Sequence, residues 1–313
     1  MVTLPLTPIA LGTDVPTLAQ STIFSIHETA INLQVDGMDE LVSITTDPEA
    51  VTVTSVGCAV SARFDGFSAL RLHRGDQAAI TGESIQLRGG HSVGIRIQSE
   101  CPVYTGRIGP VAPAAAGAAD KDAGMIARRL ATRVLAEASD RQIKGLAPLC
   151  GVLAYETFGP DQPAAGEQRS DGFSRAVLAR ARRVLAEASR GQDFERALPE
   201  FVGLGPGFTP SGDDFVVGFL AARQLTGRGV RAQTRERIAG RAASTTLAGA
   251  TLLRQALRGS FPAYLKAFAL AAGTAAVALT DAVEVPFSRA AVHGASSGLD
   301  TLSGFAFGLV PSG

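Results

Sequence analysis

The sequence contains only three cysteines, Cys58, Cys101 and Cys150, which are odd in number and far apart. Because no C-x-x-C pair occurs, the chain has neither the spacing of a zinc knuckle nor that of a redox motif. Isolated cysteines of this kind are typical of a reducing compartment. We therefore expect free thiols and a cytoplasmic location.

The chain also lacks segments suited to a membrane or to nucleic acid. Its most apolar stretch, 267–279, is shorter than the roughly 20 residues that cross a bilayer, so we expect a buried helix there. The N-terminus has no basic segment and is interrupted by Pro5 and Pro8, which makes it a poor signal peptide. No dense cluster of Lys and Arg occurs, which argues against nucleic acid or an anionic membrane as a partner.

What the sequence does have is apolar residues. Of its 313 residues, 46% are hydrophobic and 19% charged, which suits a large core and two domains. The formal charge is zero but uneven, because residues 1–108 carry 11 acidic and 6 basic residues whereas the remainder carries 18 and 23. A mildly basic second part suits a small anionic ligand.

The first 108 residues have the pattern of short strands. Alternating or β-branched segments predict strands over 31–35, 51–56, 84–88 and 92–97. Asp36-Gly37 predicts a turn, and Gly89-Gly90 predicts a hairpin between the last two strands. We expect a β-rich domain over 1–108, either a β-sandwich or a barrel-like unit.

The remainder has the pattern of helices. Helix formers with periodic apolar residues predict helices over 123–139, 173–189, 211–225, 232–258, 262–282 and 297–309. A Pro-, Ala- and Gly-rich segment, 109–117, predicts a linker over 109–122. The fold class we expect is α+β: a β-rich domain followed by a mainly helical domain over 123–313.

One segment recurs within the helical part. Residues 203–214 read G-L-G-P-G-F-T-P-S-G-D-D, and S-G-x-D-x-x-x-G-F occurs both at Ser211 and, 86 residues later, at Ser297. In each copy an apolar stretch follows the aspartate, as at the start of a buried helix. A helix start exposes N–H groups and a positive dipole end, so it attracts anions.

The glycine-rich loop before the first copy is not a known phosphate motif. It lacks the G-K-[ST] of a Walker A loop and does not fit G-x-G-x-x-G. Its alternate glycines permit close approach of a ligand, and backbone N–H groups can hold an anion without lysine. Ser211 and Asp214 also fit a capping pattern, so helix capping alone remains the alternative explanation.

The two copies predict a single site. We expect the two helices to cross near Gly218 and Gly304, so that the motif serines and aspartates enclose one cleft. Carboxylates repel phosphate, so Asp213 and Asp214 suit either Mg²⁺ or the NH₂ group of an amide. Two more side chains are candidates: His293, just before the second copy, and Arg254, which can bind a carboxylate in a bidentate manner.

These patterns define the candidate site residues. The catalytic candidates are Asp213, Asp214, Asp300 and His293, and the candidate metal ligands are Asp213 and Asp214. The candidate ligand-binding residues are Gly203, Gly205, Gly207, Thr209, Ser211, Gly212, Ser296, Ser297, Gly298 and Arg254.

At G-L-G-P-G-F-T-P-S-G-D-D-F and H-G-A-S-S-G-L-D-T-L-S-G the chain resembles a bacterial family that contains AllH, a subunit type associated with oxamate carbamoyltransferase in anaerobic allantoin breakdown. The strand Ile31-Asn32-Leu33 extends the resemblance into the β-rich part. The family tends to read G-H-T-S-G-x-D, whereas here Gly294 and Ala295 separate His293 from Ser296-Ser297-Gly298.

The resemblance implies a reaction and partners. It implies carbamoyl transfer between carbamoyl phosphate and oxamate, physiologically the phosphorolysis of oxalurate, or the use of a related ureido or amide compound. It also implies partner subunits, one of them similar to acyl-CoA synthetase chains. Two alternatives stay open: a non-catalytic assembly or ligand-binding subunit, and a metal-dependent amide hydrolase.

Overall fold

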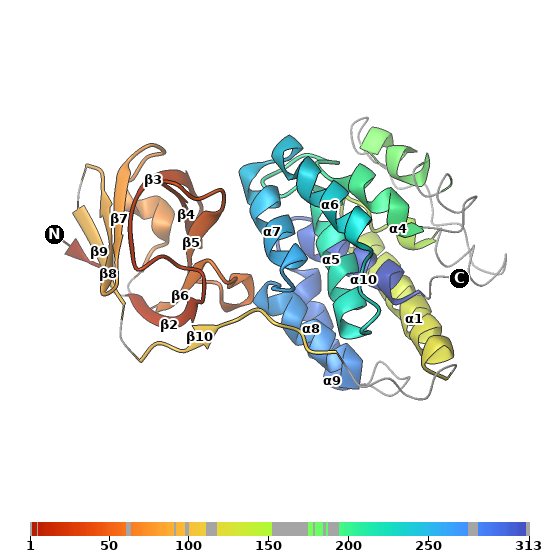
Figure 1. Cartoon of the computed structure of the whole chain (residues 1–313). Helices are drawn as coiled ribbons and strands as arrows, with labels where there is room; N and C mark the ends of the chain where they lie inside the picture. Colours follow the sequence, from red (N-terminus) through yellow and green to blue (C-terminus); the bar gives the residue numbers. More distant parts are fainter. Residues whose placement is uncertain are drawn as a thin grey trace. The chain divides into compact units, whose positions relative to one another are not determined.

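The computed structural model describes residues 2–4, 6–60, 64–90, 92–97, 100–110, 118–151, 175–177, 179–183, 186, 194–274 and 281–310. The chain divides into two compact units, Met1–Gly106 and Arg107–Gly313 (Figure 1). The linker predicted over 109–122 lies partly outside the described residues. Among the described residues, no helix combines the length and the apolar composition that crossing a membrane requires.

The first unit is a single curled sheet with ten described strands. They are β1 (Val2–Thr3), β2 (Leu6–Gly12), β3 (Leu18–Ile26), β4 (Ala30–Val35), β5 (Leu41–Thr45), β6 (Ser55–Val60), β7 (Gln77–Thr81), β8 (Ser84–Arg88), β9 (Ser92–Arg96) and β10 (Val103–Tyr104). Short 3₁₀ turns occur at Pro48–Ala50 and Phe67–Leu70.

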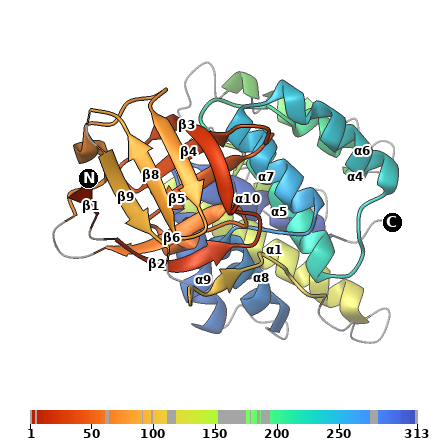
Figure 2. The same cartoon turned by 60° about the vertical axis from the view of Figure 1, so that its left-hand side comes forward.

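The strand order explains the curl. It runs β1-β9-β8-β7-β3-β4-β5-β6-β2-β10, so β1 pairs with β9 near one end and β2 pairs with β6 near the other. Because β1 and β2 follow one another directly in the chain, the two ends of the sheet must approach each other (Figure 2). Inward side chains such as Ile31, Leu33, Ile44 and Ile80 then fill the interior.

Most strand predictions in this unit are confirmed, but the strand predicted over 51–56 is wrong. The strand there is β6, which begins at Ser55. Val51 and Val53 are buried, as the pattern indicated, but in irregular chain. The Ser55 N–H donates to the Thr52 carbonyl at 3.1 Å, and the hydroxyls of the two residues lie 2.9 Å apart. Local bonds of this kind compete with a strand ladder.

The second unit is helical. Its described elements are α1 (Ala118–Asp140), α4 (Phe194–Ala197), a 3₁₀ turn (Leu198–Phe201), α5 (Ser211–Leu225), α6 (Ala232–Arg241), a 3₁₀ turn (Ala242–Ser244), α7 (Leu247–Leu257), α8 (Ala263–Thr274), α9 (Asp281–Ala291) and α10 (Ser297–Leu309). The α+β class is confirmed. Helices α5 and α10 lie at the centre of this unit and pack against each other, with α1 against α10 and with α7 and α8 against α5 (Figures 1 and 2).

The predicted helices agree with the structure to different degrees. Both motif helices have the predicted bounds, 211–225 and 297–309. The helix predicted over 173–189 lies partly outside the described residues, of which 175–177, 179–183 and 186 are helical. The helix predicted over 262–282 does not extend as predicted, because α8 ends at Thr274 and Ala282 belongs to α9, which continues past Pro286.

The single helix predicted over 232–258 is also wrong, because two hydroxyls interrupt it. The Ser244 hydroxyl donates to the Arg241 carbonyl at 2.7 Å, which ends the preceding turn. The Thr246 hydroxyl then accepts the N–H of Gly249 at 3.0 Å and caps α7. A capping threonine stabilises a new helix start better than it continues an old one.

Candidate functional site

Helices α5 and α10 cross at two glycines. A Cβ on Gly218 would lie 1.8 Å from the carbonyl oxygen of Thr301, and a Cβ on Gly304 would lie 1.9 Å from that of Phe215. The two contacts are equivalent, because Phe215 and Thr301 each follow the aspartate of their S-G-x-D motif. A side chain at either glycine would overlap with backbone, so this crossing requires both. The crossing predicted from the sequence is confirmed.

A second pair of glycines repeats the symmetry. A Cβ on Gly212 would lie 1.9 Å from the carbonyl oxygen of Phe201, and a Cβ on Gly298 would lie 1.9 Å from that of Ala290. Each glycine follows the serine of its motif. These two candidate ligand-binding glycines therefore pack each motif helix onto the segment that precedes it.

The crossing brings the serine of each motif to the aspartate of the other. Ser211, at the start of α5, hydrogen-bonds the carboxyl of Asp300 on α10. Ser297, at the start of α10, hydrogen-bonds the carboxyl of Asp214 on α5. We call these four residues the crossing cluster. The crossing therefore brings these four polar side chains together at the starts of the two helices.

Within the crossing cluster, Asp214 is buried and bonded by hydroxyls. It is 2% exposed, and its Oδ2 accepts the hydroxyl of Thr209 at 3.2 Å. The Thr209 hydroxyl also lies 3.0 Å from that of Ser297. Burial raises the pKa of Asp214 well above its ordinary value, and the charge of Asp300 raises it further, against the Ser297 hydrogen bond. Thr209 therefore connects the glycine loop to the crossing cluster.

Asp300 is completely buried and only partly satisfied. Its Oδ1 accepts the N–H of Leu146 at 2.5 Å, whereas its Oδ2 makes no hydrogen bond within the described part of the chain. Burial raises the pKa of Asp300 to about 6, although Leu146 and the hydroxyls of Ser211 and Ser296 lower it. A Cβ on Gly145 would lie 2.5 Å from Oδ1, so this loop packs directly on the carboxyl.

The sequence contains no motif that marks Gly145 and Leu146, which lie in a loop after α1. Their role depends on the position of a loop that is 154 residues from Asp300 in the chain. Only the tertiary structure could identify them.

The carboxyl of Asp213 accepts hydrogen bonds from other parts of the chain than Asp214 and Asp300 do. Its Oδ1 accepts the N–H of Gly203 at 2.8 Å, and its Oδ2 accepts the hydroxyl of Thr245. A Cβ on Gly249 of α7 would lie 2.1 Å from Oδ2. Burial raises the pKa of Asp213 to about 6, against these two hydrogen bonds. Asp213 therefore joins the glycine loop, α5 and the start of α7.

The glycine loop has the backbone freedom that its sequence predicted. Gly203, Gly205 and Gly207 have positive φ angles of 74°, 119° and 108°, where residues with a Cβ are strained. The N–H groups of Gly205 and Gly207 make no hydrogen bond within the described part of the chain. Gly207 and Phe208 are exposed at the outer end of the loop. The loop therefore presents unbonded donors near solvent.

Both ends of the loop are fixed. The N–H of Gly212 donates to the carbonyl of Leu204 at 2.7 Å, and the hydroxyl of Thr246 donates to the carbonyl of Phe208 at 2.6 Å. Thr245 and Thr246 were not among the site residues predicted from the sequence. Two threonines before a run of helix formers are a capping signal, and this signal could have found them.

Two candidates lie at the edge of the arrangement. The ring of His293 stacks on Tyr264 of α8 with centroids 4.3 Å apart, and the Tyr264 hydroxyl lies 3.2 Å from that of Thr301. Arg254 is half-buried on α7, five residues after Gly249 and therefore about 140° around the helix from the contact with Asp213. The structure thus packs His293 beside α10 and places Arg254 on another face of α7.

The arrangement is layered. The loop tip is exposed, the hydroxyl-bearing residues Thr209, Ser296 and Ser297 are half-buried, and the three carboxyls are buried. Within the described part of the chain, no group of three or more His, Cys, Asp or Glu side chains could hold a metal ion. In this layered arrangement, the hydroxyls and the loop amides lie closer to solvent than the three carboxyls do.

Comparison with known proteins bears on the same segment. The family model described as oxamate carbamoyltransferase subunit AllH matches residues 201–309. This range contains the glycine loop, both motifs and helices α5 to α10, so the resemblance predicted from the two motifs is confirmed. No curated protein and no solved structure matches the chain.

Proposed function

We propose that the glycine loop and the crossing cluster form the substrate site of a carbamoyltransferase subunit. The substrates are carbamoyl phosphate and oxamate, or a related amide or ureido compound, and the physiological direction is phosphorolysis of oxalurate. One observation carries the proposal: the two S-G-x-D motifs, 86 residues apart, bond to each other reciprocally inside the range that matches the AllH family.

The loop supplies donors for the anionic part of the substrate. The N–H groups of Gly205 and Gly207 are unbonded within the described part of the chain, and the loop tip is exposed. Backbone N–H groups in a glycine-rich turn bind phosphate or carboxylate oxygens without lysine. Backbone donors of this kind also stabilise charge that develops during the transfer.

The hydroxyls supply acceptors for the amide part. A hydroxyl carries one proton, and Thr209 donates its proton to Asp214. The Thr209 hydroxyl can therefore still accept a hydrogen bond through its lone pairs, but it has no second proton to donate. Both substrates carry an NH₂ group, and a hydroxyl that a carboxylate fixes as an acceptor is suited to such a donor. In this proposal the carboxyls orient the hydroxyls rather than meet the phosphate.

The transfer itself requires a proton acceptor. In the direction of oxalurate synthesis, the oxamate nitrogen forms a C–N bond to the carbamoyl carbon, the bond from that carbon to the phosphate oxygen breaks, and the nitrogen loses a proton. Asp300 has a pKa of about 6 and is bonded to the half-buried Ser296. We assign to this pair the acceptance of that proton, and its return in phosphorolysis.

The test is carbamoyl transfer by the reconstituted complex. Asp214→Asn and Thr209→Val should each lower kcat/KM by about 10²-fold or more, because the hydroxyl orientation is lost. Asp140→Asn, an exposed aspartate at the end of α1, is the matched control and should leave the rate unchanged. Full activity of a folded, assembled Asp214→Asn complex would eliminate the proposal.

A second candidate function is a non-catalytic assembly subunit in the same complex. The observation in its favour is that Asp213, Asp214 and Asp300 are no more than 2% exposed. Calorimetry distinguishes the two: binding of carbamoyl phosphate or oxamate to the chain supports the substrate site. Partner binding that is independent of ligand, with no heat from either compound, supports assembly alone.

The remaining assignments belong to the same proposal. We place the protein in the cytoplasm, with the other carbamoyltransferase subunits, including an acyl-CoA synthetase-like chain, as its partners. The metal-dependent hydrolase is tested by elemental analysis of the purified protein and by assay with and without Mg²⁺. A divalent ion bound at Asp213 and Asp214 would favour it over transfer.

A further inference from the structure

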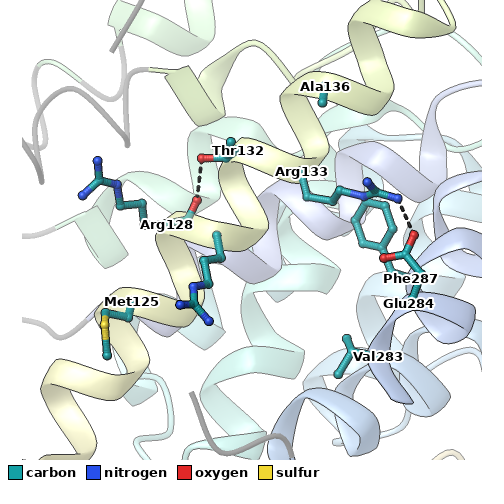
Figure 3. Close-up of a pocket in the computed structure, with 9 residues that line it drawn as sticks. Met125, Arg128, Thr132, Arg133, Ala136, Val283, Glu284 and Phe287 are labelled. Atoms are coloured by element: carbon teal, nitrogen blue, oxygen red, sulfur yellow. Dashed lines mark hydrogen bonds and ion pairs between the residues drawn. The ribbon is translucent and has the colours of Figure 1, made fainter. Parts of the chain in front are cut away.

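Helix α1 packs beside α9 and leads into a loop that reaches the crossing cluster. Arg133 of α1 pairs with Glu284 of α9, and its guanidinium lies 5.3 Å from the centre of the Phe287 ring (Figure 3). Together with Arg128 and Arg129, it also lines a groove of about 810 Å³ beside α9. The contacts of Arg133 therefore join α1 to α9 about two turns before α1 ends.

The loop after α1, residues 141–150, is fixed to α9 and α10 at three points. Near its start, the guanidinium of Arg141 donates to the carbonyl of the last residue of α9 at 2.7 Å. In its middle, the N–H of Leu146 donates to Oδ1 of Asp300 at 2.5 Å. At its end, the side chain of Cys150 hydrogen-bonds a serine of α10. We call this segment the α1 loop.

Gly145 permits the contact between the α1 loop and Asp300. Its φ angle is 154°, where residues with a Cβ are rare, and a Cβ there would lie 2.5 Å from Oδ1 and 2.9 Å from Oδ2 of Asp300. A side chain at this position would therefore displace the whole carboxyl. Because Gly145 immediately precedes Leu146, its lack of a side chain lets the Leu146 N–H reach Oδ1.

The other oxygen of Asp300 has no hydrogen-bond partner. Among the fully buried side-chain oxygens of the described residues, Oδ2 of Asp300 is the one that makes no hydrogen bond. By contrast, Asp213 accepts a hydrogen bond at each of its two oxygens. An unbonded buried acceptor lowers stability, so a native structure that keeps one calls for an explanation. The unbonded Oδ2 points to a role of this atom in the reaction.

The α1 loop determines which oxygen of Asp300 is left unbonded. The two oxygens of a carboxyl are chemically equivalent, and rotation about the Cβ–Cγ bond exchanges them. The N–H of Leu146 ends this equivalence, because it holds Oδ1 in place. Asp300 therefore presents Oδ2 in one orientation, and proton transfer depends on an acceptor that is fixed within reach of the proton.

We propose that Gly145 and Leu146 are positioning residues for the transfer reaction, which they serve through the carboxyl of Asp300. The inference rests on the proposed function, in which Asp300 with Ser296 accepts the proton that the oxamate nitrogen loses. That proton arrives at Oδ2 as the C–N bond forms and the bond to the phosphate oxygen breaks, and Oδ2 returns it in phosphorolysis. The site thereby includes a loop outside residues 201–309, the range that matches the family model.

The first experiment removes only the N–H group. In the full-length chain Leu146 is replaced by its α-hydroxy acid, which exchanges the N–H for an oxygen, and the complex is reconstituted. We expect kcat for carbamoyl transfer to fall by about tenfold or more and KM to change by less than about twofold. The same replacement at Ala147, whose N–H makes no hydrogen bond within the described part of the chain, is the control and should retain the rate.

The pH profile separates positioning from general damage to the fold. The N–H of Leu146 lowers the pKa of Asp300, so without it the acidic limb of kcat should move to higher pH by about half a unit or more. A change that merely loosened the fold would lower kcat at every pH and leave the limb in place. An unchanged limb, or equal losses in the Leu146 and Ala147 variants, would overturn the proposal.

The second experiment adds a methyl group to the α1 loop. Gly145→Ala should lower kcat by about tenfold or more, because its Cβ displaces the carboxyl. Gly124→Ala on α1, where nothing lies within 4 Å, is the matched control and should be fully active.

Asp300→Asn in the same assay separates this inference from the proposed function. Full activity of Asp300→Asn would overturn the proton transfer assigned to Asp300 and the positioning role with it. An inactive Asp300→Asn beside fully active Leu146 and Gly145 variants would overturn the positioning role alone.

Discussion

The hydroxyl of Ser211 hydrogen-bonds the carboxyl of Asp300, and the equivalent serine of the second motif bonds the equivalent aspartate of the first. Together with the reciprocal glycine contacts, this relates α5 and α10 by an approximate two-fold axis through their crossing. The elements outside the motifs break the symmetry. Thr209 bonds Asp214, whereas the N–H of Leu146 bonds Asp300. The two aspartates are therefore similar in origin but different in environment.

The glycine crossing predicts a large effect of a single methyl group. Gly218→Ala and Gly304→Ala would each place a Cβ within 2 Å of a carbonyl oxygen, so the helices must separate. We expect each to lower the free energy of unfolding by about 3 kcal/mol or more in urea denaturation. Gly240→Ala is the control, because Gly240 lies in α6 with nothing within 4 Å. It should stabilise the protein slightly, and equal losses at all three glycines would contradict the crossing.

The reciprocal hydrogen bonds predict separate effects on two carboxyl groups. Ser297→Ala removes a hydrogen bond that lowers the pKa of Asp214, so that pKa should rise further. Ser211→Ala should likewise raise the pKa of Asp300 above about 6. Carboxyl ¹³C NMR titration measures both values. The exposed Ser288→Ala is the control, and a shift of the wrong aspartate in either variant would refute the reciprocal pairing.

Burial of Asp300 predicts a stability that falls as the pH rises. Its pKa is about 6 in the folded protein against an ordinary value of 3.8, so between these values the folded state holds a proton that the unfolded chain has lost. Asp300 therefore lowers the free energy of unfolding progressively as the pH rises through that window. The loss reaches roughly 2–3 kcal/mol above pH 6.

Asp300→Asn removes this group from the pH dependence. Between pH 4 and pH 7, the variant should therefore lose roughly 2–3 kcal/mol less unfolding free energy than the unsubstituted protein does. Urea denaturation at the two pH values measures the difference. The exposed Asp140→Asn is the control. An unchanged pH dependence in Asp300→Asn would show that Asp300 is ionised at both values.

The capping threonine predicts a local effect on the glycine loop. Thr246 caps α7 and donates to the Phe208 carbonyl, so Thr246→Ala should lower the free energy of unfolding by about 1–2 kcal/mol and speed hydrogen exchange in the loop. Thr246→Ser keeps the hydroxyl and should restore most of both. If serine were no better than alanine, the hydroxyl would not be what holds the loop.

Much of this site could be predicted from the sequence. The S-G-x-D-x-x-x-G-F repeat contains both helix starts and both crossing glycines, and the bounds of α5 and α10 follow from their apolar runs. Such signals are local, because capping and helix periodicity act within a few residues. The helix predicted over 232–258 missed the break before Thr246, although two threonines before a run of helix formers are a local capping signal.

By itself the sequence determined the β-rich and helical parts, the glycine loop and the pairing of the two motif helices, because each depends on neighbours in the chain or on a repeated pattern. Only the tertiary structure decided that Asp213 holds the loop, that Leu146 reaches Asp300, and that the arginines of α1 line a groove beside α9. These contacts join residues that are distant in the chain. Their formation depends on how whole helices pack, which no local pattern encodes.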